Sequence, residues 1–359
     1  MANDKRYIYG FLAKLLRPGN NRLELLSYLP ANQGFWDDLV KVGSSHLVLP
    51  AIYLNFKLKK ISEFLPKQLY EYLKEIQEIN FQRNKLITNQ IKFISKIFKD
   101  EFNYVFIKGS ALLFLNDINF KKARMIGDID LLVEEKNIYK AKQILIENGF
   151  QEHSYEKKLI NSENNFSKHL NRMTNSNFIC AVELHRFLID DLNKKILDSN
   201  DILKSKKMVN GIWIPSLIYL WKISVLNWQY NDHGKLYNYF SFRTILDVFS
   251  VQPKNLKTQL LNETDSIRSF YGLIAVFYPE FSDFYSLSTV IYKLKLKYKW
   301  FNITHIYIVK TILLLKVVYS RLFLLSSNTH YRNVVLRNPK LIFKKIHDFW
   351  NHKQDVKKT

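Results

Sequence analysis

Residues 128–133, Asp-Ile-Asp-Leu-Leu-Val, decide the fold because they place two carboxylates at the start of an apolar strand. Alternation along a strand puts the side chains of Asp128 and Asp130 on one face and those of Ile129 and Leu131 on the other. Two carboxylates on one face repel each other unless a cation lies between them. A divalent metal ion bound together with substrate phosphates meets that need. The stretch therefore predicts a strand that carries a metal site, although an Asp-x-Asp triplet alone is a weak signal.

Two further segments carry residues that suit a metal–phosphate site. Upstream, the β-formers of 104–107 end at 108–110, Lys-Gly-Ser, where a glycine, a hydroxyl and the free N–H groups of a following helix suit a phosphate. Downstream, 182–185, Val-Glu-Leu-His, is a predicted strand with Glu183 and His185 on one face. An ordinary strand–helix turn and a structural salt bridge are the alternatives. Together the segments favour phosphoryl or nucleotidyl transfer, in which two metal ions on three carboxylates stabilise the attacking and leaving oxygens.

The surrounding sequence is mostly helical. Apolar residues at three- and four-residue steps predict a long helix over 66–100. Further helices are predicted at 111–115, 137–148, 215–226 and 242–251, and a strand at 178–184.

The predicted fold class is α+β. A small mixed β-sheet core over 101–190 is expected between an N-terminal helical region over 1–100 and a C-terminal helical domain over 191–359. The base and the acceptor are expected to bind in a cleft between the core and the C-terminal helices.

The motifs resemble the polymerase-β-type nucleotidyltransferase superfamily, and more closely the bacterial group named nucleotidyltransferase family 5. That group has Lys-Gly-small, an Arg shortly before Asp-Ile-Asp-Leu-Leu-Val, a Gly-aromatic pair after one helix, and Glu-Leu-His. The matching residues here are Lys108-Gly109-Ser110, Arg124, 128–133, Gly149-Phe150 and Glu183-Leu184-His185. The resemblance covers 101–190. It extends loosely to Arg243 and Asp247, which lie four apart on a predicted helix and are expected to pair with each other or with the core.

The resemblance implies a metal site. Asp128 and Asp130 would hold Mg²⁺, with Mn²⁺ as the alternative, together with the triphosphate of an NTP. Glu183 would be the third metal ligand or the base that accepts the proton of an attacking hydroxyl.

The resemblance also implies a nucleotide site at Lys108, Gly109, Ser110 and Arg124. Gly109 and Ser110 would cradle the β- and γ-phosphates. Lys108 and Arg124 would face phosphate charge, and a structural ion pair explains each of them equally well. His185 would orient the acceptor or relay a proton, and a packed, hydrogen-bonded histidine is the alternative.

The implied reaction transfers a nucleoside monophosphate from an NTP to a hydroxyl and releases pyrophosphate. The base stays open, with ATP among the candidates. The acceptor is a small molecule, a sugar or lipid head group, a protein side chain or RNA. Two alternatives come from other classes of protein. One is a non-catalytic nucleotide-sensing or partner-binding module of the same fold. The other is a nucleic-acid or membrane-surface binder that uses the basic C-terminal residues.

The charge of the chain is strongly positive and unevenly distributed. The 359 residues include 54 Lys and Arg against 32 Asp and Glu, a formal net charge of +22. Fifteen Lys and Arg but only two Asp lie in 291–359. An anionic partner, such as RNA or a peripheral membrane surface, would explain this excess. Codon bias in an AT-rich genome and a solvated basic face are the alternatives. Apolar residues of 336–350 recur at helical spacing and predict a packed face.

Three remaining features concern location. The apolar stretch 303–325 is interrupted by Lys310, Lys316 and Arg321, so it predicts a buried or interfacial helix and no transmembrane segment. The first residues lack an apolar signal core, and the expected location is cytoplasmic. Cys180, the single cysteine, excludes an internal disulfide and is expected in the core.

Overall fold

A computed structural model describes residues 5–19, 21–29, 32–99, 101–115, 118–152, 168–189, 195–327 and 329–337. The predicted packed face over 336–350 falls almost entirely outside these residues, as does the end of the basic segment 291–359.

A mixed five-stranded sheet carries the motif residues. Its strands are β1 (Tyr104–Phe106), β2 (Ile129–Val133), β3 (Gln151–Glu152), β4 (Met173–Thr174) and β5 (Val182–His185). The spatial order is β1-β2-β5-β4-β3, with β2 and β5 parallel and the other pairs antiparallel. Every residue of β2 is buried, which explains why all of them except Asp130 are apolar. The helices of this part are α6 (Lys108–Leu115), α7 (Ile118–Ala123) and α8 (Ile138–Glu147).

Strand β5 is shorter and later than the predicted strand 178–184. The prediction was wrong for 178–181, because a side chain takes the backbone groups that a strand would need. The amide of Gln90 donates to the carbonyl of Cys180 at 2.7 Å, and its Oε1 accepts from the N–H of Cys180 at 3.2 Å.

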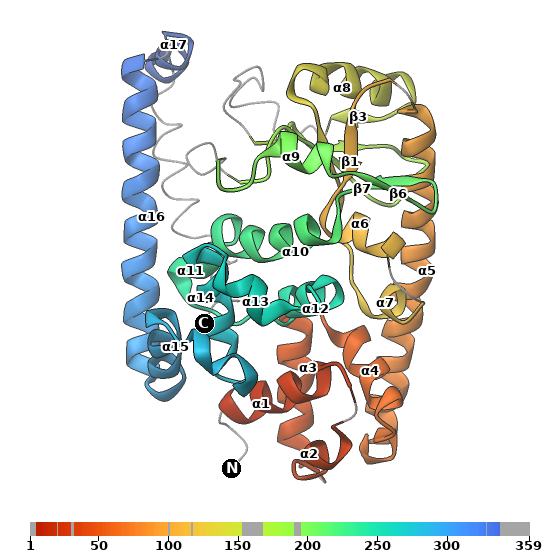
Figure 1. Cartoon of the computed structure of the whole chain (residues 1–359), viewed down its shortest axis with the longest axis vertical. Helices are drawn as coiled ribbons and strands as arrows, with labels where there is room; N and C mark the ends of the chain where they lie inside the picture. Colours follow the sequence, from red (N-terminus) through yellow and green to blue (C-terminus); the bar gives the residue numbers. More distant parts are fainter. Residues whose placement is uncertain are drawn as a thin grey trace.

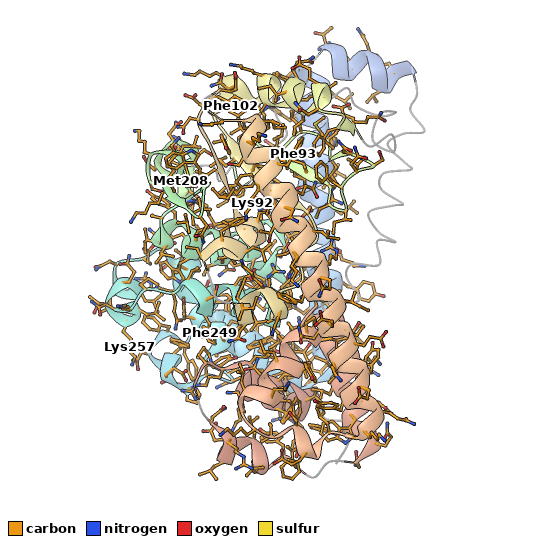
Figure 2. The ribbon with its side chains drawn as sticks, turned by 90° about the vertical axis from the view of Figure 1, so that its right-hand side faces the viewer. Lys92, Phe93, Phe102, Met208, Phe249 and Lys257 are labelled. Atoms are coloured by element: carbon orange, nitrogen blue, oxygen red, sulfur yellow. The ribbon has the colours of Figure 1, made fainter. Side chains whose placement is uncertain are left out.

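The N-terminal region is helical, as expected. It contains α1 (Lys5–Leu16), α2 (Arg22–Leu26), α3 (Gln33–Ser45), α4 (Leu49–Leu58) and α5 (Lys67–Ile97). Helix α5 confirms the predicted helix over 66–100, with Pro66 as its N-cap residue. It runs along one side of the molecule from the N-terminal helices to the sheet (Figure 1). Figure 2 shows Lys92 and Phe93 on the end of α5 near the sheet, close to Phe102.

The described part of the C-terminal region is helical apart from one hairpin. Its helices are α9 (Ser199–Lys204), α10 (Leu217–Leu226), α11 (Gly234–Tyr237), α12 (Phe242–Val251), α13 (Leu256–Leu261), α14 (Asp265–Ile274), α15 (Leu287–Lys297), α16 (Lys299–Ser327) and α17 (Thr329–Arg337). A one-turn π-helix spans Asn227–Asn231. The hairpin of β6 (Lys207–Val209) and β7 (Ile212–Ile214) was not expected from the sequence. These elements confirm the α+β class, with helices on both sides of a small mixed sheet.

One continuous cluster of buried apolar side chains joins the N-terminal helices, the sheet and the C-terminal helices as far as Tyr292. Helix α16 stands apart from that cluster. Among the α16 side chains whose burial is described, Ile306, Val309 and Leu313 are buried in a small second cluster, beside Tyr237. Of the predicted alternatives for 303–325, a buried or an interfacial helix, the described residues show a helix that is buried along one face. Among the described residues, no helix is both long enough and apolar enough to cross a membrane.

Candidate active site

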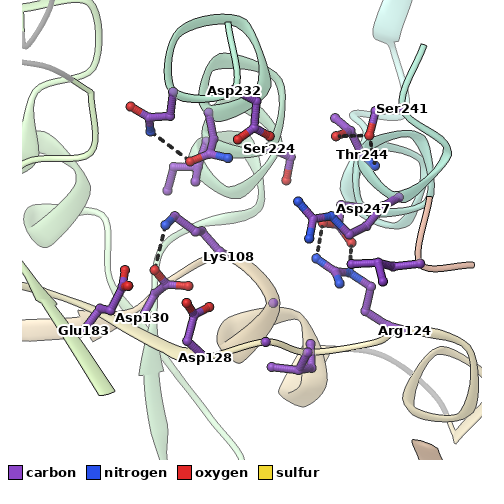
Figure 3. A pocket seen from close by; sticks show the side chains of 18 of the residues that line it. Lys108, Arg124, Asp128, Asp130, Glu183, Ser224, Asp232, Ser241, Thr244 and Asp247 are labelled. Carbon is purple, nitrogen blue, oxygen red and sulfur yellow. Dashed lines mark hydrogen bonds and ion pairs between the residues drawn. The ribbon is translucent and has the colours of Figure 1, made fainter. Parts of the chain in front are cut away.

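The parallel pairing of β2 and β5 brings the predicted carboxylates together. Asp130 lies directly opposite Glu183 in the register, and both side chains point to the same face of the sheet. Asp128, just before β2, lies beside them at the mouth of the site (Figure 3). The side chains of Asp130 and Glu183 are 5% and 8% exposed, whereas that of Asp128 is 30% exposed. The group therefore has two buried carboxylates and one that faces solvent.

Lys108 neutralises the most buried carboxylate. Its Nζ lies 2.6 Å from Oδ1 of Asp130, and its backbone is in the left-handed region at φ 52°. A non-glycine residue in that region is uncommon and carries a conformational cost. The turn before α6 thus holds the lysine against Asp130, which is the ion-pair alternative that the sequence left open for Lys108.

Arg172 links the other two carboxylates. Its Nε donates to Oε1 of Glu183 at 2.6 Å, and its Nη2 donates to Oδ2 of Asp128 at 3.1 Å. Arg172 was not predicted as a site residue, because it lies between two very short strands and outside every motif. Its bridge supplies the cation that the clustered carboxylates require.

His185 lies beneath this group as a buried positioning residue. Its side chain is 1% exposed, and its Nε2–H donates to Oδ1 of Asp130 at 2.8 Å. The same nitrogen lies 3.5 Å from Oε2 of Glu183. Of the two alternatives for His185, this placement favours the packed, hydrogen-bonded histidine.

The pKa values of the three carboxylates diverge. Burial raises the pKa of Asp128, and the charges of Asp130 and Glu183 raise it further. Burial also tends to raise the pKa of Asp130. The Lys108 charge and the His185 hydrogen bond outweigh this effect and lower the pKa of Asp130 to about 2. Burial is likewise outweighed at Glu183, where hydrogen bonds from His185 and Arg172 hold the pKa below its usual range. Asp130 and Glu183 are therefore ionised at neutral pH.

Polar side chains of α5 fix the segments that lead into β2 and β5. Asn80 donates to the carbonyls of Lys122 and Arg124, and Asn84 donates to those of Lys121 and Arg124. Arg83 donates to the carbonyl of Ile126. Together with Gln90 at Cys180, these contacts set the positions from which the two strands start.

Arg124 forms a buried ion pair with α12. Its Nε and Nη2 meet the two carboxylate oxygens of Asp247 at 2.5 and 2.8 Å. The two side chains are only 9% and 13% exposed. A bidentate pair fixes both partners in orientation. It ties the segment before Asp128 to the C-terminal helices, and it is the structural alternative foreseen for Arg124.

Gly109 and Ser110 support the turn from within. A Cβ on Gly109 would lie 2.7 Å from Cδ1 of Ile126, so the glycine admits the segment that precedes β2. Ser110 is fully buried, and its Oγ accepts a hydrogen bond from the N–H of Asp130 at 3.1 Å. Its hydroxyl thus contacts the backbone of β2, and Ser110 is not among the described residues that line the neighbouring cavity.

The carboxylates open into a cavity of about 640 Å³ between the sheet and the C-terminal helices. That volume is within the range of small-molecule sites. Figure 3 shows Ser224 and Asp232 across the cavity from the three carboxylates, with the Lys108 side chain between them. The π-helix also contributes Asn227 and Asn231 to the lining. Single-turn π-helices occur often at functional sites.

The donor set fits a hard divalent cation. Ligand atoms of Asp130, Glu183 and His185 lie within 4.8 Å of one another, and Asp128 adds a third carboxylate at the solvent side. Mg²⁺ prefers oxygen ligands and is usually bound by one or two carboxylates plus phosphates. In the structure, Lys108 and Arg172 place positive charge beside these same oxygens and neutralise part of their negative charge.

Comparison with known proteins agrees with this geometry. No curated protein and no solved structure matched the chain. A family model described as "Uncharacterised nucleotidyltransferase" matches residues 32–249, which include the whole sheet, its carboxylates and the Arg124–Asp247 pair. The match spans more than half of the sequence, and the chain belongs to this family of nucleotidyltransferases, which transfer phosphorus-containing groups.

Proposed function

We propose that this enzyme transfers a nucleoside monophosphate from an NTP to a hydroxyl acceptor, with Asp128, Asp130 and Glu183 as the ligands of Mg²⁺ or Mn²⁺. The observation that carries the proposal is the register of β2 and β5. It sets Asp130 opposite Glu183 at the wall of a cavity that is large enough for a nucleotide. A divalent ion bound there would neutralise the triphosphate and the leaving pyrophosphate.

Other residues of the chain would bind the phosphates and hold the catalytic carboxylates in place during the reaction. The acceptor oxygen attacks the α-phosphorus, the bond from that phosphorus to the bridging oxygen breaks, and pyrophosphate leaves. Lys108, at the start of α6, points into the cavity and would meet the phosphates, as would the free N–H groups of that helix. Arg124 would act indirectly, by fixing the segment that carries Asp128.

Glu183 would accept the proton of the acceptor hydroxyl. In the structure its pKa is low because, against the effect of burial, His185 and Arg172 hydrogen-bond to it. Movement of Arg172 from Glu183 to the incoming phosphates would remove one of these bonds and raise that pKa. Arg172 would thus couple substrate binding to the basicity of Glu183.

The test incubates the purified chain and lysate with each of four NTPs labelled at the α-phosphate, with and without Mg²⁺. The proposal predicts Mg²⁺-dependent labelling of an acceptor by the wild type and none by Asp130→Asn. A matched control is Glu263→Gln, because Glu263 is another buried carboxylate paired to a lysine, with Lys222 at 2.8 Å, outside the cavity lining. Equal labelling by Asp130→Asn and wild type would refute the catalytic assignment.

A further inference from the structure

Helix α16 presents a broad apolar surface to solvent. From residue 307 to residue 323, six of its large apolar side chains are between 53% and 73% exposed: Tyr307, Ile308, Leu315, Tyr319, Leu322 and Phe323. A group of exposed apolar side chains that lie together on a folded protein marks an interaction site. Figure 1 shows α16 at the edge of the molecule, with α15 and α11 beside its lower half and α17 at its upper end.

The helix has two distinct faces. Successive residues of an α-helix are rotated by about 100°, so the buried residues Ile306, Val309 and Leu313 form one stripe. The six exposed side chains lie around the opposite side of the same cylinder. The run from Tyr307 to Phe323 spans about 24 Å at 1.5 Å per residue. The exposed face is therefore long and continuous.

Basic residues border this exposed face. Lys299, Lys310 and Arg321 are spaced eleven residues apart, which is close to three turns, so they follow one edge. Lys316 lies near the opposite edge. Between Asp283 and Asp348 the sequence contains twelve Lys and Arg and no acidic residue. The segment of sequence that carries the apolar face is thus strongly basic.

We propose that α16 lies in the plane of an anionic lipid surface, with its apolar face among the acyl chains and its bordering cations at the lipid phosphates. This arrangement suits helices with an apolar face and a basic polar border. Lys and Arg can extend their charged ends toward the head groups while their stems cover apolar surface. The surface is separate from the proposed nucleotidyl transfer and does not depend on it.

Charge favours lipid over the other occupants. A second copy of α16 would bring the same basic edges together without an acidic residue in this segment to pair them. A nucleic acid would match the charge but would leave the apolar side chains against phosphates. An anionic lipid surface supplies both an apolar phase and negative charge.

The experiment is flotation of the full-length chain with two kinds of vesicle. One contains phosphatidylglycerol and phosphatidylcholine, and the other contains phosphatidylcholine alone. The proposal predicts flotation with the anionic vesicles that weakens as salt rises, and little flotation with the neutral ones. The double variant Leu315→Glu/Leu322→Glu should lose about a hundredfold in vesicle affinity. The double variant Lys310→Gln/Arg321→Gln should lose roughly thirtyfold.

A matched control changes apolar residues of similar exposure elsewhere. Leu23 and Leu261 are 85% and 69% exposed, and Leu23→Glu/Leu261→Glu should float like the wild type. Circular dichroism and thermal melting check that each variant is folded. Absence of flotation by the wild type, or equal loss in the control, would overturn the proposal. So would sedimentation showing a dimer that Leu315→Glu/Leu322→Glu dissociates while no vesicle is bound, because the occupant would then be a second copy.

Discussion

The buried pair of Arg124 and Asp247 gives a prediction with a calculable magnitude. Asp247→Leu would leave the guanidinium of Arg124, which is only 9% exposed, without its carboxylate. Removing one partner of a buried ion pair costs about 3–5 kcal/mol, because the other charge stays buried. Arg124→Met should cost a similar amount. The double variant Arg124→Met/Asp247→Leu removes both charges and should be close to wild type in stability.

Urea unfolding followed by circular dichroism measures the four free energies of this double-mutant cycle. Since each single variant should lose about 3–5 kcal/mol and the double variant little, we expect a coupling energy of about 6–10 kcal/mol between the two positions, with unchanged m-values. A coupling below about 1 kcal/mol would refute the view that this pair ties the segment before Asp128 to α12.

The same double variant separates the two roles of Arg124. If Arg124 only holds the segment before Asp128 in place and does not contact substrate, the affinity of the double variant for Mg²⁺ and a fluorescent NTP should be within a few-fold of the wild-type affinity. Normal stability with an affinity loss of about tenfold or more would show that Arg124 contacts phosphate directly.

Three further predictions test other contacts. Gly109→Ala should lower the free energy of unfolding, measured with urea, by about 1 kcal/mol, since its Cβ would lie 2.7 Å from Cδ1 of Ile126. Adding Ile126→Val should relieve part of that loss. If the losses of the two single variants simply add in the double variant, the contact is not the cause. Arg172→Met should bind Mn²⁺ alone several-fold more tightly in calorimetry, because the arginine competes for the carboxylates of Asp128 and Glu183; weaker Mn²⁺ binding would count against that competition. The pKa of Asp130 is lowered from 3.8 to about 2, so its ionised form stabilises the fold by about 2 kcal/mol above the unfolded pKa, and this contribution is lost as the pH falls toward 2. The difference in unfolding free energy between wild type and Asp130→Asn should therefore shrink over that range, and a constant difference would argue against the shift.

Much of the core could be predicted because its signals are local. The alternation of 128–133 predicts a strand with both Asp side chains on one face, and β2 begins at Ile129. The apolar spacing of 66–100 predicts α5, and α12 has the predicted bounds of 242–251. The family was also predicted from the order of these motifs, and the family match confirms it.

The rest of the site depends on contacts between distant segments. Asn80, Asn84 and Gln90 interrupt the apolar pattern of α5 and look like solvent-facing residues, but they are buried against backbone groups between 37 and 90 residues away. Arg172 belongs to no motif, and its role follows only from the neighbouring strands. A sequence pattern specifies local geometry but does not identify the partners of a buried polar side chain.

For α16 the sequence predicts a buried or interfacial helix, but it does not specify which part of the helix is covered. An apolar stretch predicts burial only where another element covers it, and most of this helix faces solvent. For Ser110, the type of turn suggests a hydroxyl that contacts phosphate. In the structure that hydroxyl instead accepts a hydrogen bond from the backbone of β2.

Binding of a metal–nucleotide complex tests the central claim most directly. Calorimetry would titrate the wild type, Asp130→Asn and the Glu263→Gln control with α,β-methylene analogues of the four NTPs, with Mg²⁺ or with EDTA. We expect the wild type and Glu263→Gln to bind an analogue only with Mg²⁺. Asp130→Asn should lose about tenfold or more in affinity while it remains folded. Wild-type affinity in folded Asp130→Asn, or equal binding with EDTA, would contradict a metal–nucleotide site at these carboxylates.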